Sequence, residues 1–160
     1  MKGKRTIRRT LLRWRIALGG MAWWRFTAVV FAATFAISLT AEALYRLMTG
    51  TDVAAAELQR AGWLVAVMIA PLVETLVAQG LVIWIVRKAL PGSVLWPVLF
   101  SAVVFCGGHR SSPIYLVCML LIGAVLAFAY LSRLDRRGFA QAFLLVFFAH
   151  ALNNAMAFLI

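Results

Sequence analysis

The chain has 160 residues, of which 64% are hydrophobic, and it carries 16 Lys and Arg residues against five Asp and Glu. A soluble globular domain is about 45–50% apolar, so this composition excludes that class. The sequence therefore predicts an integral membrane protein with a formal net charge of +11.

Residues 1–20 form a basic segment that precedes the first long apolar run. Seven of the basic residues lie in its first 15 positions, and Ile7, Leu11, Trp14 and Leu18 repeat at helical spacing. We expect an amphipathic helix at the membrane surface whose arginines face the anionic headgroups of the inner leaflet. Because the positive-inside rule explains this charge, no nucleic-acid partner is expected.

Five apolar runs follow, each long enough to cross a bilayer, which takes about 20 helical residues. They lie at roughly 26–48, 61–86, 93–112, 113–132 and 139–160. We therefore expect an all-α fold, a polytopic membrane helix bundle of about five transmembrane helices. Residues 21–160 would form its single transmembrane domain.

Basic residues mark the span ends that face the cytoplasm. If the N terminus is cytoplasmic, Arg87 and the segment 133–138 also fall inside, and the outer connections hold Arg60 and Arg110. This predicts an external C terminus, and the richness in Arg and Ala favours a bacterial inner membrane. The stretch AEA at 41–43 resembles a signal-peptidase site, but so long an apolar segment is expected to stay as an anchor.

One acidic residue, Glu74, lies inside the second apolar run, where a charged side chain costs about 2.5–3.5 kcal/mol. Its own helix offers no Lys or Arg before Arg87, so its partners must come from other helices. The candidates are Asn154 and the only two histidines of the chain, His109 and His150.

The spacing of the polar groups indicates which of them share a helix face. His150 and Asn154 are four residues apart, with Asn153 at the edge of their face, and Phe105 and His109 have the same spacing. Each alone is typical of a cross-helix hydrogen bond. One carboxylate, two imidazoles and one carboxamide together are what water activation and oxyanion stabilisation require.

Three stretches in these runs, ETLVAQG, FCGGH and HALNN, resemble in order the EExxxR, FxxxH and HxxxN motifs of the CAAX-processing and bacteriocin-processing (CPBP, or Abi) intramembrane endopeptidases. The resemblance covers about residues 61–160. It implies a glutamate-dependent intramembrane protease acting on a peptide or protein substrate without a cofactor. By this matching Glu74 is the general base, His109 assists it, and His150 and Asn154 stabilise the oxyanion.

The chain departs from the first motif at two positions. Thr75 stands in place of the second glutamate, and Gln79 in place of the arginine. Stranding one charge of a buried pair costs about 3–5 kcal/mol, whereas replacing both can be nearly neutral. We interpret the change as coordinated, with two neutral groups that can still hydrogen-bond. Thr75 and Gln79 are therefore expected to support the site, together with Phe105 and Asn153.

Three other functions are compatible with parts of this pattern. A non-catalytic protein of the same fold could bind a peptide in a self-immunity or scaffold role. A metalloprotease could hold zinc on Glu74, His109 and His150, but HExxH is absent and no acidic residue remains as a base, so zinc is not favoured. Five spans without a repeat argue against common transporter plans.

Overall fold

The computed structural model describes residues 2–51, 61–109 and 112–158, and every regular element in these ranges is a helix. In chain order they are α1 (Lys2–Gly20), α2 (Trp23–Thr49), η1 (Val65–Ile69), α4 (Ala70–Glu74), η2 (Thr75–Leu81), α5 (Val82–Ala89), α6 (Leu95–Cys106), α7 (Pro113–Arg137) and α8 (Phe139–Ala157). The label η marks a π-helical segment, and η1 to α5 form one continuous helix, residues 65–89. The expected all-α membrane helix bundle is confirmed.

Four described helices are long and apolar enough to cross a membrane: α2, the helix 65–89, α7 and α8. The third expected span, 93–112, is wrong in its length, because α6 has only 12 residues and ends at Cys106. At 1.5 Å per residue it is about 18 Å long. Glycines at 107 and 108 follow it at once, and glycine is a poor helix former. Arg60 and Arg110, expected in the outer connections, lie outside the described residues.

The helix 65–89 accommodates a proline in its interior by widening. Proline has no N–H and its ring collides with the carbonyl four residues earlier, which in an α-helix would be that of Val67. The turns that precede Pro71 are π-helical, so the amide of Ala70 donates to the carbonyl of Val65, five residues back. π segments are rare and often occur at functional sites. Here they flank Glu74 on both sides.

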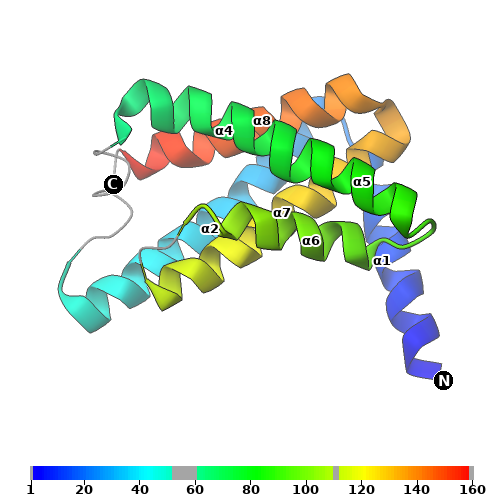
Figure 1. Ribbon diagram of the computed structural model, residues 1–160, viewed down its shortest axis with the longest axis horizontal. Helices are drawn as coiled ribbons and strands as arrows, with labels where there is room; N and C mark the ends of the chain where they lie inside the picture. Colours follow the sequence, from blue (N-terminus) through cyan, green and yellow to red (C-terminus); the bar gives the residue numbers. More distant parts are fainter. Residues whose placement is uncertain (1, 52–60, 110–111, 159–160) are drawn as a thin grey trace.

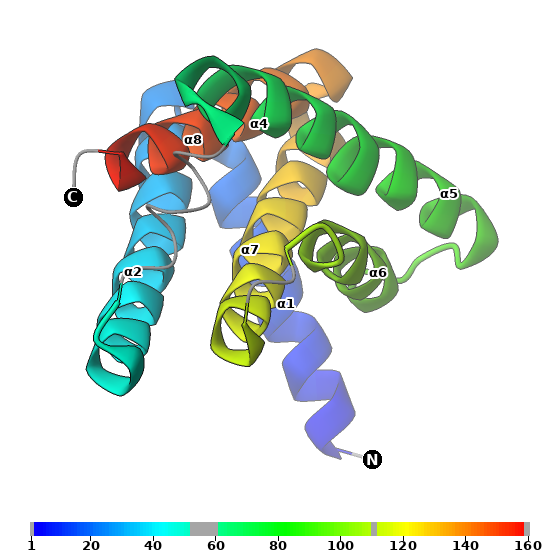
Figure 2. The same ribbon diagram turned by 60° about the vertical axis from the view of Figure 1, so that its left-hand side comes forward.

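The central helix of the bundle is α7, which contacts α1, α2, α6 and α8 (Figure 1). Its inward face carries Leu126, Ala127, Ala129 and Tyr130, all at most 1% exposed. Figure 2 shows the helix 65–89 and α8 crossing over one end of α7. The start of α1 and the end of α8 lie at opposite ends of the long axis (Figure 1).

One end of the bundle collects the basic segments. Asp135 of α7 pairs with Arg87 of α5 at 2.9 Å and with Arg15 of α1 at 3.6 Å. A side chain at Gly19 would collide with the carbonyl oxygen of Ser132, so only glycine allows α1 to approach α7 this closely. We call this end the basic end of the bundle.

Gly123 sets the approach of α7 to α6. A Cβ added there would lie 2.9 Å from Cδ1 of Phe105 and 3.1 Å from Cα of Ala102. Gly123→Ala is expected to lower the free energy of unfolding by about 1–3 kcal/mol, because it overpacks a filled interface. Reversible unfolding in micelles measures this. The control is Gly20→Ala, where an added Cβ would meet nothing within 4 Å. Equal losses in the two variants would contradict the packing argument.

Candidate active site

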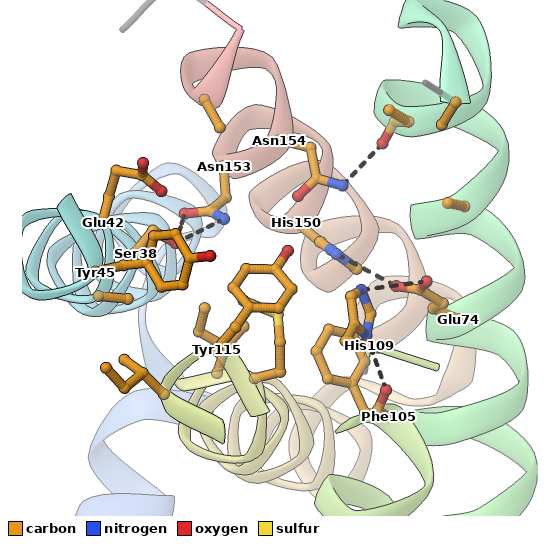
Figure 3. A pocket seen from close by; sticks show the side chains of 18 residues that line it. Ser38, Glu42, Tyr45, Glu74, Phe105, His109, Tyr115, His150, Asn153 and Asn154 are labelled. Atoms are coloured by element: carbon orange, nitrogen blue, oxygen red, sulfur yellow. Dashed lines mark hydrogen bonds and ion pairs between the residues drawn. The ribbon is translucent and has the colours of Figure 1, made fainter. Parts of the chain in front are cut away.

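Glu74 ends α4 in the middle of the helix 65–89, and its carboxylate faces two imidazoles (Figure 3). Nε2 of His150 is 3.5 Å from Oε2 of Glu74, and Nε2 of His109 is 4.0 Å from Oε1. The Glu74 side chain is 28% exposed and that of His150 is 4% exposed. Two imidazoles therefore meet one carboxylate, as the sequence predicts: Glu74 and His150 come from two helices, and His109 comes from the segment that follows α6.

The contacts of His109 indicate where its proton lies. Nδ1 is 3.1 Å from the carbonyl oxygen of Phe105, which only accepts, so Nδ1 carries a hydrogen and donates it. In a neutral ring Nε2 then presents a lone pair toward the Glu74 carboxylate, which is also an acceptor. Two acceptors 4.0 Å apart need a donor between them, and a water molecule can donate one O–H to each. The geometry therefore fits a carboxylate and an imidazole that share a water.

His150 lies in α8 and faces the other oxygen of the Glu74 carboxylate, Oε2. Its Nε2 faces the carboxylate, whereas its Nδ1 is buried and no described group hydrogen-bonds to it. The carboxylate is the acceptor available to Nε2, which favours the tautomer with its hydrogen on Nε2. The ring of Phe105 contacts both imidazoles, with centroids 5.2 Å from His109 and 5.4 Å from His150. Phe105 therefore packs against both rings.

Asn154 binds the widened turn that precedes Glu74. Its Nδ2 donates to the carbonyl oxygen of Ala66 at 2.8 Å. That carbonyl has no partner in its own helix, because the amide of Ala70 donates to Val65 and Pro71 has no N–H. A carboxamide has two N–H donors, so one remains for the cavity. Asn154 therefore ties α8 to the helix that carries Glu74.

Asn153 points to the other side, toward α2 (Figure 3). It exchanges hydrogen bonds with the hydroxyl of Ser38, at 3.2 and 3.3 Å. Glu42 and Tyr45 lie on the same face of α2 and also line the cavity, so α2 contributes a polar wall that the sequence analysis missed. The signal was present, because positions 38, 42 and 45 are spaced i, i+4, i+7.

A cavity of about 160 Å³ joins these groups. Its lining comes from α2, Ala61, the helix 65–89, α6 and the segment after it, α7 and α8. Its polar members are Ser38, Glu42, Tyr45, Glu74, His109, Tyr115, His150, Asn153 and Asn154. A water molecule takes a share of about 30 Å³ in the liquid. The space therefore holds several waters or a short piece of extended peptide.

A comparison with protein families decides the identity of the chain. The model described as type II CAAX prenyl endopeptidase Rce1-like matches residues 55–156. This chain belongs to the Rce1-like family. The match confirms the resemblance to the CPBP endopeptidases, and with it a protease-like fold of the CAAX type. Searches of curated proteins and of solved structures return no match.

The two positions where this Rce1-like chain departs from the first motif are buried. Thr75 and Gln79 are both 0% exposed, and no described group hydrogen-bonds to the hydroxyl of Thr75 or to either polar atom of the Gln79 carboxamide. The interpretation that the two substitutions are coordinated stays a prediction. Both lie in the π segment η2, where residues four apart do not stack as in an α-helix.

The supporting role expected for Thr75 and Gln79 stays a prediction, as does the absence of a metal. Within the part of the chain that the structure describes, no group of three or more His, Cys, Asp and Glu side chains could hold a metal ion. Structural zinc sites in proteins use four ligands, and catalytic sites use three with one open position.

Proposed function

We propose that this Rce1-like protein is an intramembrane endopeptidase that hydrolyses a peptide bond in a membrane-associated or secreted peptide or protein. The observation that carries the proposal is the Glu74 carboxylate next to the imidazoles of His109 and His150, at 4.0 and 3.5 Å, in a cavity with room for water and peptide. Acidic and basic side chains that converge in one cavity are typical of sites for general acid–base catalysis.

In the proposed reaction a water molecule lies between Glu74 and Nε2 of His109. Glu74 accepts a proton from it while the oxygen attacks the scissile carbonyl carbon, and the C=O oxygen becomes an oxyanion. The Nε2–H of His150 and the second N–H of Asn154 stabilise that charge. When the C–N bond breaks, the proton on Glu74 passes to the leaving amine. The carboxylate is regenerated, and no metal takes part.

The experiment compares new peptide termini in membranes of cells that produce the wild type or Glu74→Gln. Mass spectrometry of enriched termini is expected to find cleaved membrane or secreted proteins only with the wild type. A non-catalytic relative that binds a peptide would give no new termini with either chain. It would instead carry the same bound peptide in both, since Glu and Gln have the same size.

We also propose that the basic end faces the cytoplasm of a bacterial inner membrane and that the C terminus lies outside. The support is the gathering of Arg15, Arg87 and Asp135 at one end of the bundle, with a surplus of Lys and Arg there. Alkaline phosphatase fused to the C terminus is then expected to be active, and green fluorescent protein fused at residue 92 to fluoresce. Activity of alkaline phosphatase at residue 92 instead would reverse the topology.

A further inference from the structure

A second groove lies at the basic end, away from the candidate active site. It has a volume of about 420 Å³ and forms where α2 begins and α7 passes into α8. It is lined by Met21, Ala22, Trp23, Arg133, Arg137, Gln141, Leu144 and Leu145. Its walls thus combine two guanidinium groups with apolar side chains. One of these is Trp23, and tryptophan is enriched at the interface between membrane and water.

Arg133 is a buried cation, only 3% exposed, held by neutral acceptors. Its guanidinium donates to the carbonyls of Gly19 and Met21, at 3.1 and 2.7 Å, and to Oε1 of Gln141 at 2.9 Å. Its Nε is buried and no described group hydrogen-bonds to it. Hydrogen bonds to neutral oxygens satisfy donors but leave the positive charge without a counter-charge, which is costly in a buried site.

The acidic residue closest in sequence does not supply that counter-charge. Asp135 pairs with Arg87 at 2.9 Å and with Arg15 at 3.6 Å. Arg137 lines the same groove and adds a second positive charge. The helix α2 also starts at the groove, and its N-cap residue Ala22 provides no side-chain cap. A helix N-terminus without a cap leaves backbone N–H donors for an anion.

We propose that this groove binds one anionic phospholipid of the membrane leaflet at the basic end. The headgroup phosphate lies against Arg137 and neutralises the charge of Arg133, while an acyl chain lies along Leu144 and Leu145. A lipid fits better than a soluble anion because apolar walls adjoin the cations at the end of the membrane helices. Basic pockets between transmembrane helices on the cytoplasmic side commonly hold such headgroups. The proposal is independent of catalysis, since no residue of the groove lines the cavity around Glu74.

The test titrates the purified full chain in micelles with phosphatidylglycerol and measures bound lipid by native mass spectrometry. Arg137→Gln is expected to raise the Kd of the first phosphatidylglycerol about fivefold, since a Lys or Arg near the membrane surface contributes about that factor. The matched control is Arg136→Gln, which removes the same charge from the same helical turn but not from the groove lining. It is expected to leave this Kd unchanged, and Arg137→Lys is expected to retain most of the binding.

Two further arms separate the lipid from other sources of negative charge. Phosphatidylcholine, which has no net charge, is expected to bind the wild type and Arg137→Gln equally. Inorganic phosphate is expected not to displace phosphatidylglycerol. An equal loss of phosphatidylglycerol affinity in Arg136→Gln and Arg137→Gln would contradict binding in this groove. Displacement of phosphatidylglycerol by inorganic phosphate would contradict a phospholipid as the ligand.

Discussion

Glu74→Gln is expected to lower kcat/KM by a factor of about 10² to 10⁴, the contribution typical of a positioned general base. The amide keeps the size of the carboxylate and its place next to the imidazoles of His109 and His150, which lie 4.0 and 3.5 Å from the carboxylate. It cannot accept the proton that water must lose. Folding should survive, because a neutral amide is cheaper to bury than a carboxylate. Initial rates in proteoliposomes, on a peptide copied from an identified cleavage site, measure the effect.

The matched control is Glu42→Gln, which removes a carboxylate from the opposite wall of the same cavity. This substitution changes the charge of the cavity that binds the substrate but leaves the Glu74 carboxylate unchanged. We therefore expect it to alter KM more than kcat. Equal losses of kcat in both variants would mean that cavity charge, rather than a base at Glu74, drives the reaction. A metal chelator that removes the wild-type activity would contradict the metal-free mechanism.

Much of the fold follows from elementary properties of the sequence. Apolar runs of about 20 residues predict spans, and the ends of α2, α7 and α8 fall close to the expected ones. The expected span 93–112 ran past the end of α6, although Gly107, Gly108 and the polar residues after them interrupt the apolar pattern. Hydropathy measures transfer into lipid, whereas helix length also depends on backbone propensity.

The gathering of Glu74, His109 and His150 was predictable because a buried carboxylate needs partners and the chain offers few. The detailed contacts of the carboxamides were not. They depend on the π turn before Pro71, which frees the carbonyl of Ala66, and no hydrophobic pattern reports a widened turn. The polar wall of α2 is a different case. Its spacing was visible, but which helix face meets the cavity is a matter of tertiary packing.

Asn154→Ala is expected to lower kcat by a factor of about 10² to 10³, the usual loss when one oxyanion donor is removed. The same substitution also removes the hydrogen bond to the carbonyl of Ala66, 2.8 Å long, which should cost about 1–3 kcal/mol in unfolding free energy. Asn154→Ala is thus expected to lower both kcat, through the transition state of the reaction, and the stability of the folded protein. Rates at saturating substrate and unfolding in micelles measure them separately.

Asn153→Ala separates these two effects, because the neighbouring carboxamide has the same chemistry but binds Ser38 of α2 instead. It should lose stability, since it removes two hydrogen bonds to the partly buried Ser38, while kcat falls far less than with Asn154→Ala. Equal kcat in the two variants would assign Asn154 to holding the π turn alone and remove it from the oxyanion site. If the two variants lose a similar unfolding free energy but Asn154→Ala loses more kcat than Asn153→Ala, an N–H of Asn154 must act on the reacting carbonyl. The second hydrogen of Nδ2 is available for that role, since the carbonyl of Ala66 uses only the first.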